Sequence, residues 1–442
     1  MVVLDWNGTT IGTGTDRIGA IWISGAEIFR TSTPETDGAS WHVEKDVSEY
    51  SSLFTSSHNV TSIVTAYSGK IKVVASLSFY ETSQQYPEPS IPEIIVPVSN
   101  AQGSPWFTIS NSQTQGNTTV TFRKDTMNVT LEVYATAHKC DETWFDSYVI
   151  PVPGCSGNDA FREIQVLLDG NLSGLVWPVP VIYTGGINEN LWETIPSVNA
   201  LNIPPVVVPF TPFASQLADG RPHTIGFKVV GDEGYWLVDA NLLVDLDPHV
   251  QAVAGELTGY NVPDASRRDS VNIDWLLSRA TISQDDSRDL TISGYVNSSI
   301  GTIETTVKQK MSMSNTQVVT RNHLAESFSA EGSVTTTIIT TDMGILRNET
   351  EIESYSVGFS QSIVSTNGIL IIEVDENVQL QHISSLNGVS SMELSSDLVV
   401  AHSNGHTSED YSYTTSSGIC YDRHISTTHG SITNNFETTN CR

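Results

Sequence analysis

The segment Ile71-Lys-Val-Val-Ala-Ser-Leu-Ser-Phe79 decides the fold class, because apolar and polar side chains alternate along it almost without interruption. Alternation with a period of two places one face of a strand against a core and the other in solvent. The same β-rich composition recurs in Ile18-Gly-Ala-Ile-Trp-Ile23, Thr130-Leu-Glu-Val-Tyr-Ala-Thr136 and Ile164-Gln-Val-Leu-Leu168. Turn-forming dipeptides such as Asp169-Gly170 lie around these runs. The sequence therefore predicts an all-β protein built from packed antiparallel sandwiches.

Two changes in amino-acid composition divide the chain. Repeated prolines in 86–97 cannot sit in central strands and mark a linker. A second boundary lies near Asp247-Pro248-His249, beyond which the chain is dense in Ser and Thr. We therefore predict a first sandwich over 1–97, a second over 98–248 and a β-rich C-terminal domain over 249–442, composed of long, mostly solvent-facing hairpins. Only Ser270 to Arg279 carries a pattern that could form a short helix.

The 442-residue chain contains 38% hydrophobic residues, enough for proper cores, but only 16% charged residues. Together with its abundant Ser and Thr, this composition is typical of extracellular β-sheet proteins. The formal net charge of −29 argues against nucleic acid or an anionic membrane as a partner. Because carboxylates lose their charge around pH 4 to 5, this charge is compatible with work in an acidic medium.

The cysteines and sequons indicate secretion. The four cysteines form two local pairs, Cys140 with Cys155 and Cys420 with Cys441. They predict two loop-closing disulfides in an oxidising compartment, the alternative being four buried thiols. Seven N-glycosylation sequons are compatible with secretion; they begin at Asn7, Asn59, Asn117, Asn128, Asn171, Asn297 and Asn348.

The chain shows neither a membrane span nor a leader. No apolar run reaches the roughly 18 residues that a membrane-spanning helix needs. Met1 leads directly into a predicted strand without a signal peptide, so we expect the N-terminal end to be truncated. We expect a monomer that acts outside the cell or in an acidic vacuolar compartment.

The strong catalytic signatures are absent: the sequence has no P-loop, no G-x-S-x-G elbow and no H-E-x-x-H zinc motif. Carboxylates with basic or aromatic neighbours instead gather at predicted strand ends, in Thr15-Asp-Arg-Ile18, His138-Lys-Cys-Asp-Glu-Thr-Trp-Phe145 and Phe161-Arg-Glu163. A carboxylate can activate water while an arginine stabilises the developing oxyanion. The structural alternative makes Asp16-Arg17 a local ion pair, Asp141-Glu142 a solvated loop and Trp144 a core residue.

Several sequence segments, in a fixed order along the chain, together resemble those of a known protein family. They comprise Ala160-Phe-Arg-Glu-Ile-Gln-Val-Leu-Leu-Asp-Gly170, Trp177-Pro-Val-Pro-Val-Ile-Tyr-Thr-Gly-Gly-Ile-Asn188, Leu191-Trp-Glu193, Phe210-Thr-Pro-Phe213, Asp219-Gly-Arg-Pro-His-Thr224 and Tyr235-Trp-Leu-Val-Asp-Ala-Asn-Leu242. Upstream, Asp16-Arg-Ile-Gly-Ala-Ile-Trp22 and Glu27-Ile-Phe-Arg-Thr-Ser32 extend the series. In order and spacing these segments resemble the peptide-N-glycosidase A family of plants and fungi, well over residues 1–250 and loosely beyond.

The resemblance implies an activity and an architecture. The activity is hydrolysis of the bond between N-acetylglucosamine and asparagine in an N-glycopeptide or glycoprotein, which releases a glycosylamine and leaves aspartate. No cofactor or metal is implied. The architecture is two adjacent jelly-roll-like sandwiches with the active cleft between them.

A more distant similarity to the bacterial peptide-N-glycosidase F implies site residues. Asp16-Arg17 matches its catalytic Asp-Arg step, which makes Asp16 the water-activating carboxylate and Arg17 its electrostatic partner. Arg162 matches a second catalytic arginine, but the expected glutamate falls on Asn158. We take Glu142 as the substitute; Asp159 and Glu163 are the other candidates. Expected substrate-binding residues are His138, Asp141, Trp144, Glu163, Trp192 and Trp236.

Three alternatives remain open from the sequence. A secreted glycan-binding protein on the same sandwiches would keep the tryptophans without paired carboxylates. The Ser/Thr-rich C-terminal region taken alone favours a structural or adhesive protein. A glycoside hydrolase also uses two carboxylates, but it leaves asparagine rather than aspartate behind.

Overall fold

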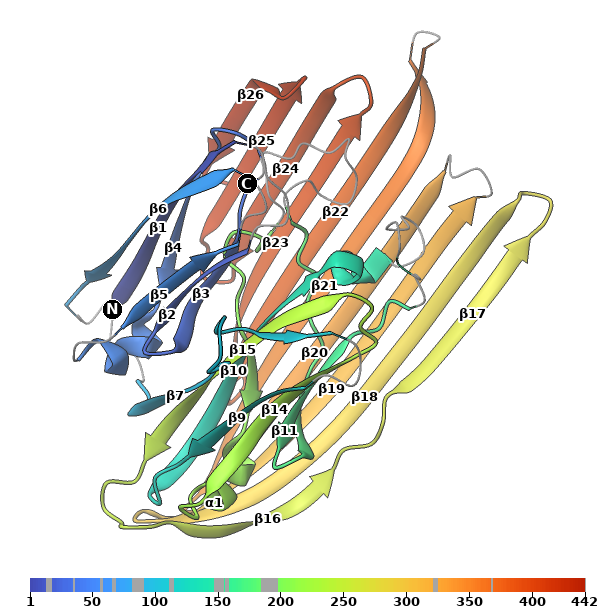
Figure 1. The fold of residues 1–442 in the computed structure, drawn as a ribbon. Coiled ribbons are helices and arrows are strands. Elements are labelled where there is room, and N and C mark those ends of the chain that lie inside the picture. The colour runs from blue at the N-terminus through green and yellow to red at the C-terminus, as the bar shows by residue number, and fades with distance from the viewer. Residues whose placement is uncertain are drawn as a thin grey trace.

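The computed structural model describes residues 1–12, 18–34, 36–55, 59–65, 69–81, 91–110, 115–146, 155, 159–183, 198–320, 325–366 and 369–441. Within these ranges the strands form five antiparallel sheets, and the helices are short, the longest being the 3₁₀ helix Ser48–Phe54 (Figure 1). The predicted all-β class is confirmed, as are the two adjacent sandwiches followed by a further β region.

The first sandwich consists of two three-stranded sheets, which have the strand orders β4-β1-β6 and β3-β2-β5. Its elements are β1 (Val2–Ile11), β2 (Ile18–Ile23), β3 (Ala26–Ser32), β4 (Ser40–Asp46), the 3₁₀ helix Ser48–Phe54, β5 (Val60–Val64) and β6 (Lys70–Phe79). Along β1, Val2, Leu4 and Trp6 are buried, while the residues between them are more exposed. These three side chains meet Phe29 and Tyr50 in one core.

The second sandwich pairs a sheet of order β13-β10-β15-β7, with β8 also on β15, and a sheet of order β12-β11-β14-β9. Its strands are β7 (Ile94–Val98), β8 (Phe107–Ile109), β9 (Gly116–Thr121), β10 (Thr126–His138), β11 (Glu163–Leu168), β12 (Asn171–Val176), β13 (Val206–Pro209), β14 (Pro222–Val230) and β15 (Tyr235–Leu246). Its short helices are Lys139–Asp141, Trp144–Asp146, Thr211–Phe213 and α1 (Ala214–Leu217). The longest strands, β10 and β15, pair through most of their length and form the centre of the domain.

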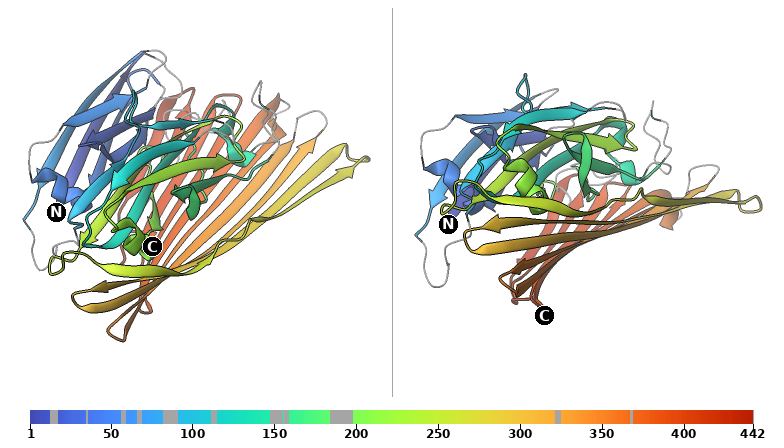
Figure 2. Two further views of the ribbon diagram at one scale, coloured as in Figure 1. Left: turned by 60° about the horizontal axis from the view of Figure 1, so that its bottom comes forward. Right: turned by 90° about the horizontal axis from the view of Figure 1, so that it is seen from below.

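One eleven-stranded sheet occupies the rest of the chain. Its strands are β16 (Ala254–Asn261), β17 (Ser266–Asp274), β18 (Arg279–Ser298), β19 (Gly301–Thr320), β20 (Glu326–Asp342), β21 (Ile345–Thr366), β22 (Ile369–Leu386), β23 (Val389–His402), β24 (His406–Thr415), β25 (Cys420–Thr428) and β26 (Ser431–Thr438). Figure 2 shows both sandwiches on the same side of this sheet.

The C-terminal strands are less solvent-facing than the Ser/Thr-rich sequence predicts. Leu290, Met311, Phe328 and Val357 project from the covered side of the large sheet into the core of the second sandwich. In β18 every second residue is buried over most of the strand. The hairpins thus join into one sheet with a covered face and an open face.

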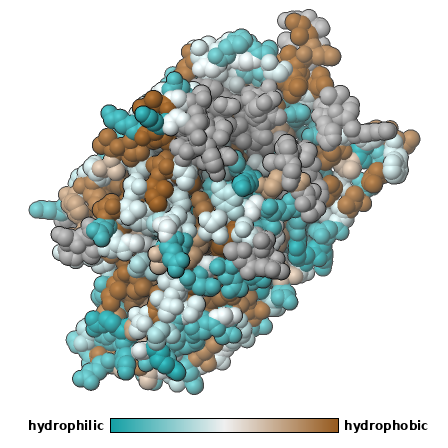
Figure 3. Space-filling view, viewed as in Figure 1, coloured by the Kyte–Doolittle hydropathy of each residue, from teal (hydrophilic) through white to brown (hydrophobic). Residues whose placement is uncertain are grey.

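The prediction of a short helix over Ser270–Arg279 is wrong. Val271 and Ile273 belong to strand β17, which pairs with β18 in continuous register, and only a turn separates the two strands. At that turn Trp275, Leu276 and Leu277 are 83%, 97% and 67% exposed. Figure 3 shows hydrophobic side chains gathered at this projecting hairpin tip. Among the described residues, no helix has the length and apolar character needed to cross a membrane.

Candidate active site

The two sandwiches meet where sheet β3-β2-β5 lies against β15. An apolar cluster fills this interface and contains Ile18, Ala20, Trp22, Trp106, Ile203 and Leu237. Tyr183 and Tyr235 pack against it as partly buried residues. Ile18 is the first described residue of β2, so the N-terminal end of β2 belongs to the same cluster as these two tyrosines.

Arg30 on β3 is the centre of a buried polar network at this interface. Its Nε and Nη2 each donate to the Glu27 carboxylate at 2.7 Å. Its Nη1 donates to the Leu237 carbonyl at 2.7 Å and to Thr136 Oγ1 at 3.2 Å, both in the second sandwich. Arg30 and Glu27 are both 0% exposed. A buried charge pair is tolerated when its hydrogen bonds are satisfied, and here they fix how β3 docks on β10 and β15.

Asp239 on β15 adds a second buried carboxyl group. Trp22 Nε1 and Ser99 Oγ each donate to it at 2.6 Å, so the Trp22 contact also joins the two sandwiches. Burial, followed by the charge of Glu27, raises the pKa of Asp239 well above its usual value.

A further polar cluster joins β4 and the 3₁₀ helix Ser48–Phe54 to β10. The Tyr50 hydroxyl donates to Glu132 Oε2 at 2.6 Å, and Lys45 Nζ donates to the Tyr134 hydroxyl at 2.9 Å. Burial raises the pKa of Glu49, whose carboxyl group neighbours that of Glu132. Burial, followed by the charge of Glu49, raises the pKa of Glu132 to about 8.

Replacing Glu132 with glutamine is expected to flatten the pH dependence of stability on the alkaline side. Folding raises the pKa of Glu132 from 4.5 to about 8, so its stabilisation is complete below pH 4.5 and is lost as the pH rises through about 8. Thermal unfolding midpoints at a series of pH values measure this slope, with Glu256→Gln on exposed β16 as the matched control. Equal slopes in the Glu132→Gln variant and in the wild type would contradict the raised pKa of Glu132.

His138 ends β10 between two tyrosine rings. Its ring centroid lies 5.0 Å from that of Tyr235 and 5.9 Å from that of Tyr183, with interplanar angles of 19° and 20°. Burial, followed by the charge of Arg30, lowers the pKa of His138 to about 3. The imidazole is therefore neutral in mildly acidic solution. It stacks the two tyrosines in place and does not serve there as an imidazolium acid.

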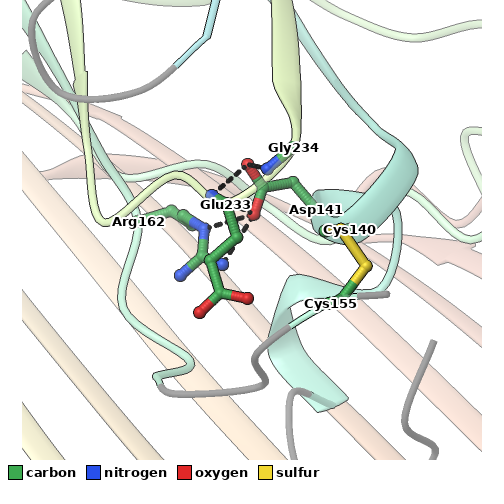
Figure 4. The surroundings of a disulfide bond; sticks show 6 residues. All are labelled: Cys140, Asp141, Cys155, Arg162, Glu233 and Gly234. Carbon is green, nitrogen blue, oxygen red and sulfur yellow. Dashed lines mark hydrogen bonds and ion pairs between the residues drawn. A yellow bond between two sulfur atoms is a disulfide. The ribbon is translucent and has the colours of Figure 1, made fainter. Parts of the chain in front are cut away.

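Asp141, three residues after His138, is buried, and both of its carboxylate oxygens accept hydrogen bonds. Arg162 donates to its Oδ1 from Nε at 2.9 Å and from Nη2 at 2.6 Å. Its Oδ2 accepts from the Gly234 amide at 3.1 Å and from Trp236 Nε1 at 2.9 Å. Figure 4 shows this carboxylate enclosed by its donors. The solvated-loop interpretation of Asp141 is therefore wrong, because the β14–β15 turn and Arg162 cover it.

All three side-chain nitrogens of Arg162 donate hydrogen bonds to the protein. Its Nη1 donates to the carbonyls of Asp159 and Phe161, both at 2.8 Å, and its side chain is 1% exposed. Arg162 therefore links Asp141, in the segment after β10, to the residues just before β11. This geometry corresponds to a positioning role for Arg162 and Asp141 rather than to direct contact with a substrate.

Both predicted disulfides are confirmed. Cys140 pairs with Cys155, and Cys420 pairs with Cys441. Cys140 precedes Asp141, so the first disulfide and the Asp141–Arg162 ion pair hold the same turn (Figure 4). Glu142, the expected second carboxylate, is half-buried directly after this braced turn, and its amide donates to the Lys139 carbonyl at 3.0 Å.

The other expected substrate-binding residues lie in packed surroundings. Trp144 and Trp236 are 3% and 1% exposed, so neither offers a ring face to a sugar; each packs in the core of the second sandwich. Glu163 accepts from Trp177 Nε1 at 3.0 Å and pairs with Arg288 of the large sheet. At these three positions, aromatic and charged side chains at strand ends serve as contacts between layers.

Four sequence-predicted positions fall outside the described residues: Asp16, Arg17, Asn158 and Trp192. The structure brings His138, Asp141, Glu142 and Arg162 together around the end of β10, and it places Glu163 against the large sheet. Sequence reasoning missed Asp239 and Glu132. A charged residue within an otherwise apolar strand, as at Arg30 and Glu132, was the sequence feature that could have predicted a buried polar network.

Carboxylate and imidazole groups close enough to hold a metal occur elsewhere in the described part of the chain. Asp5, His42 and Glu44 place one potential ligand atom each within 4.8 Å of one another. They lie on β1 and β4, on the outer face that is opposite the buried Leu4 and Trp6. This group is remote from the interface with β15, since the other sheet of the first sandwich lies between them.

The chain matches the family model described as peptide N-acetyl-β-D-glucosaminyl asparaginase amidase A over residues 1–263. It is 32% identical over 347 residues to the peptide-N4-(N-acetyl-β-glucosaminyl)asparagine amidase A of Prunus dulcis. The aligned region covers 72% of this chain, but this chain spans only 60% of the length of the Prunus protein.

Two solved structures superpose on part of this chain. A recombinant peptide:N-glycanase F superposes on 57% of this chain and 86% of its own, with a TM-score of 0.37 and 10% identity. The protein PNGF-II superposes on 55% of this chain and 57% of its own, with a TM-score of 0.35 and 14% identity. These overlaps are too loose to assign the fold, which rests on the sheets described above.

The family match covers both sandwiches, the buried Arg30 network that docks them and the braced turn at Asp141. By this match and by its identity to the Prunus protein, the chain belongs to the peptide N-acetyl-β-D-glucosaminyl asparaginase amidase A family.

Proposed function

We propose that this chain hydrolyses the amide bond between N-acetylglucosamine and asparagine in N-glycopeptides or glycoproteins. The released glycan leaves as a glycosylamine, and aspartate remains in the peptide. The observation that carries the proposal is the family match over residues 1–263, which includes both sandwiches and their interface. The 32% identity to an amidase supports it further.

The proposed mechanism is acid–base hydrolysis by carboxylates. Asp16 activates the attacking water, Arg17 stabilises negative charge, and Glu142 is the second carboxylate. Asp141 and Arg162 hold the turn that carries Glu142. A water-activating carboxylate needs a rigid surrounding, because a displacement of about 1 Å costs much of the rate.

Two features of the described residues support a site at this end of the interface. Ile18 lies in the cluster with Tyr183 and Tyr235, and Asp16 is only two residues away, within about 8 Å along the chain. The ring stack of Tyr183, His138 and Tyr235 leads from there to Glu142, four residues after His138. The two tyrosines are half-buried, and both rings stack on His138.

The product identifies the reaction. A purified N-glycopeptide is incubated with the chain at about pH 5, where the carboxylates begin to titrate, and the peptide is read by mass spectrometry. Aspartate at the former glycosylation site is the expected result. Asparagine, bare or carrying one sugar, would instead identify a glycoside hydrolase. A glycopeptide that binds without being cleaved would identify a binding protein.

We also propose that the protein is a monomer that acts outside the cell or in an acidic vacuolar compartment. Two disulfides support an oxidising route, since they are rare in proteins of the cytosol. The raised pKa values of Glu132 and Asp239 support an acidic working medium, because both groups then stabilise the folded protein most at low pH.

Asn128 is expected to stay unglycosylated in secreted material. Its Nδ2 donates to Asp245 Oδ2 at 2.7 Å and its Oδ1 accepts from Thr211, so a glycan would break both contacts. The remaining six sequon asparagines are exposed: Asn7, Asn59, Asn117, Asn171, Asn297 and Asn348. Site-by-site glycopeptide mapping measures occupancy. A high occupancy at Asn128 would contradict this expectation.

A further inference from the structure

A cleft of about 390 Å³ opens between the edge of the second sandwich and the large sheet. Its sandwich side is mostly apolar and contains Thr130 together with Leu175, Val176, Trp177, Val206, Val207 and Pro209. Val207, on the edge strand β13, is 50% exposed. The opposite wall comes from strands β19 to β22, which lie beyond the family match ending at residue 263.

Strand register directs carboxylates into this cleft. Glu353 on β21 lies directly opposite Val334 on β20, and Glu351 lies opposite Thr336. Directly opposite residues of an antiparallel pair point to the same face of a sheet. Val334 packs against the core beneath the second sandwich, so Glu351 and Glu353 share that covered face with it. Both glutamates therefore face the apolar wall.

The charges on this wall are incompletely balanced. Glu349 pairs with Arg347, and Glu351 Oε2 lies 3.2 Å from Nε2 of the half-exposed His382. Glu353 makes neither a hydrogen bond nor an ion pair with any residue that the structure describes, and burial raises its pKa against the opposing effect of His382. A partly buried carboxylate without a donor is costly for the folded protein, and a ligand cation would offset that cost.

We propose that this cleft binds an aliphatic organic cation, an ammonium or guanidinium group on a hydrocarbon chain. The charged end lies at Glu353 and Glu351, while the chain lies along Val207 and Trp177. Two carboxylates facing six apolar side chains suit this chemistry, because a neutral sugar would bury the carboxylates without neutralising them. The cleft volume is within the usual range of small-molecule sites. The inference does not depend on the proposed amidase activity.

Isothermal titration of the whole chain with n-hexylamine and with 1-hexanol at pH 7 tests the proposal. Hexylamine is expected to bind about tenfold more tightly than hexanol, a difference of about one carboxylate–ammonium contact in partly exposed surroundings. Glu353→Gln is expected to remove that difference. Glu331→Gln, on an exposed residue of β20, is the matched control and is expected to retain it. Val207→Arg, which places a tethered cation at the mouth, is expected to block binding.

The outcomes separate clearly. Equal affinities for the amine and the alcohol, an unchanged preference in Glu353→Gln, or no heat with either probe would overturn the proposal. Binding of N,N′-diacetylchitobiose in place of the amine would overturn it too and would assign the cleft to a neutral sugar. A lysine-containing peptide compared with free hexylamine identifies the source of the cation. Tighter binding of the peptide points to a polypeptide, and tighter binding of hexylamine points to a small amine.

Discussion

Replacing Asp16 with asparagine is expected to lower the rate of glycopeptide cleavage by about 10²- to 10⁴-fold, the contribution of a positioned general base. Asparagine keeps the size of the side chain but cannot take a proton from the attacking water. The substitution leaves the hydrogen bonds of Arg30 and Asp239 that dock the two sandwiches in place. The rate of aspartate formation under saturating glycopeptide measures the effect.

The control for this substitution is Asp5→Asn, the same change at a carboxylate on the outer face of β1 that pairs with His42. It is expected to leave the rate unchanged. Circular dichroism and thermal unfolding of both variants show whether either has lost its fold. A folded Asp16→Asn protein with the wild-type rate would remove Asp16 from the mechanism and shift attention to Glu142.

Replacing Arg30 with methionine is expected to destabilise the protein by about 3–5 kcal/mol, the usual effect of breaking a buried ion pair. Glu27 would be left as an unpaired buried charge, and the Leu237 carbonyl would lose its donor from the first sandwich. Because the same contacts dock the sandwiches, cleavage is expected to fall together with stability. Urea unfolding monitored by tryptophan fluorescence measures the loss.

Two variants test whether the effect comes from the buried pair. Arg221→Met removes an arginine that is 81% exposed and pairs with Asp219, and exposed pairs contribute at most about 1 kcal/mol. Combining Glu27→Met with Arg30→Met removes both charges and is expected to recover part of the stability. If Arg30→Met were no less stable than Arg221→Met, the network would not hold the sandwiches together.

The sequence was sufficient for much of the local structure, although the helix that it predicts over 270–279 is strand β17 and a turn. Alternation in 71–79 gave strand β6, and turn residues such as Asp169-Gly170 gave the β11–β12 hairpin. It was insufficient for the large sheet, since exposed faces rich in Ser and Thr look alike whether hairpins are separate or joined. The alternation of Leu290, Ile292 and Val296 was the available sign that one face is covered, but the covering layer comes from residues about 100 positions away.

The site was less predictable than the fold. The charge types at Asp141 and Arg162 were visible in the sequence, but their burial depends on Gly234 and Trp236, which reach them only after the second sandwich has formed. For the same reason Trp144 and Trp236 could not be distinguished from surface aromatics. Burial, followed by the charges of Glu49 and Glu27 in the first sandwich, raises the pKa values of Glu132 and Asp239, and no local pattern contains that information.

Cleavage of an N-glycopeptide in heavy-oxygen water tests the proposed amide hydrolysis most directly. Water that attacks the asparagine carbonyl leaves its oxygen in the new carboxyl group. The account predicts labelled aspartate at the former glycosylation site with the wild-type chain and almost none with Asp16→Asn. Unlabelled asparagine in the product, or label on the released sugar alone, would contradict it, because either would show that the bond to the sugar carbon was broken instead.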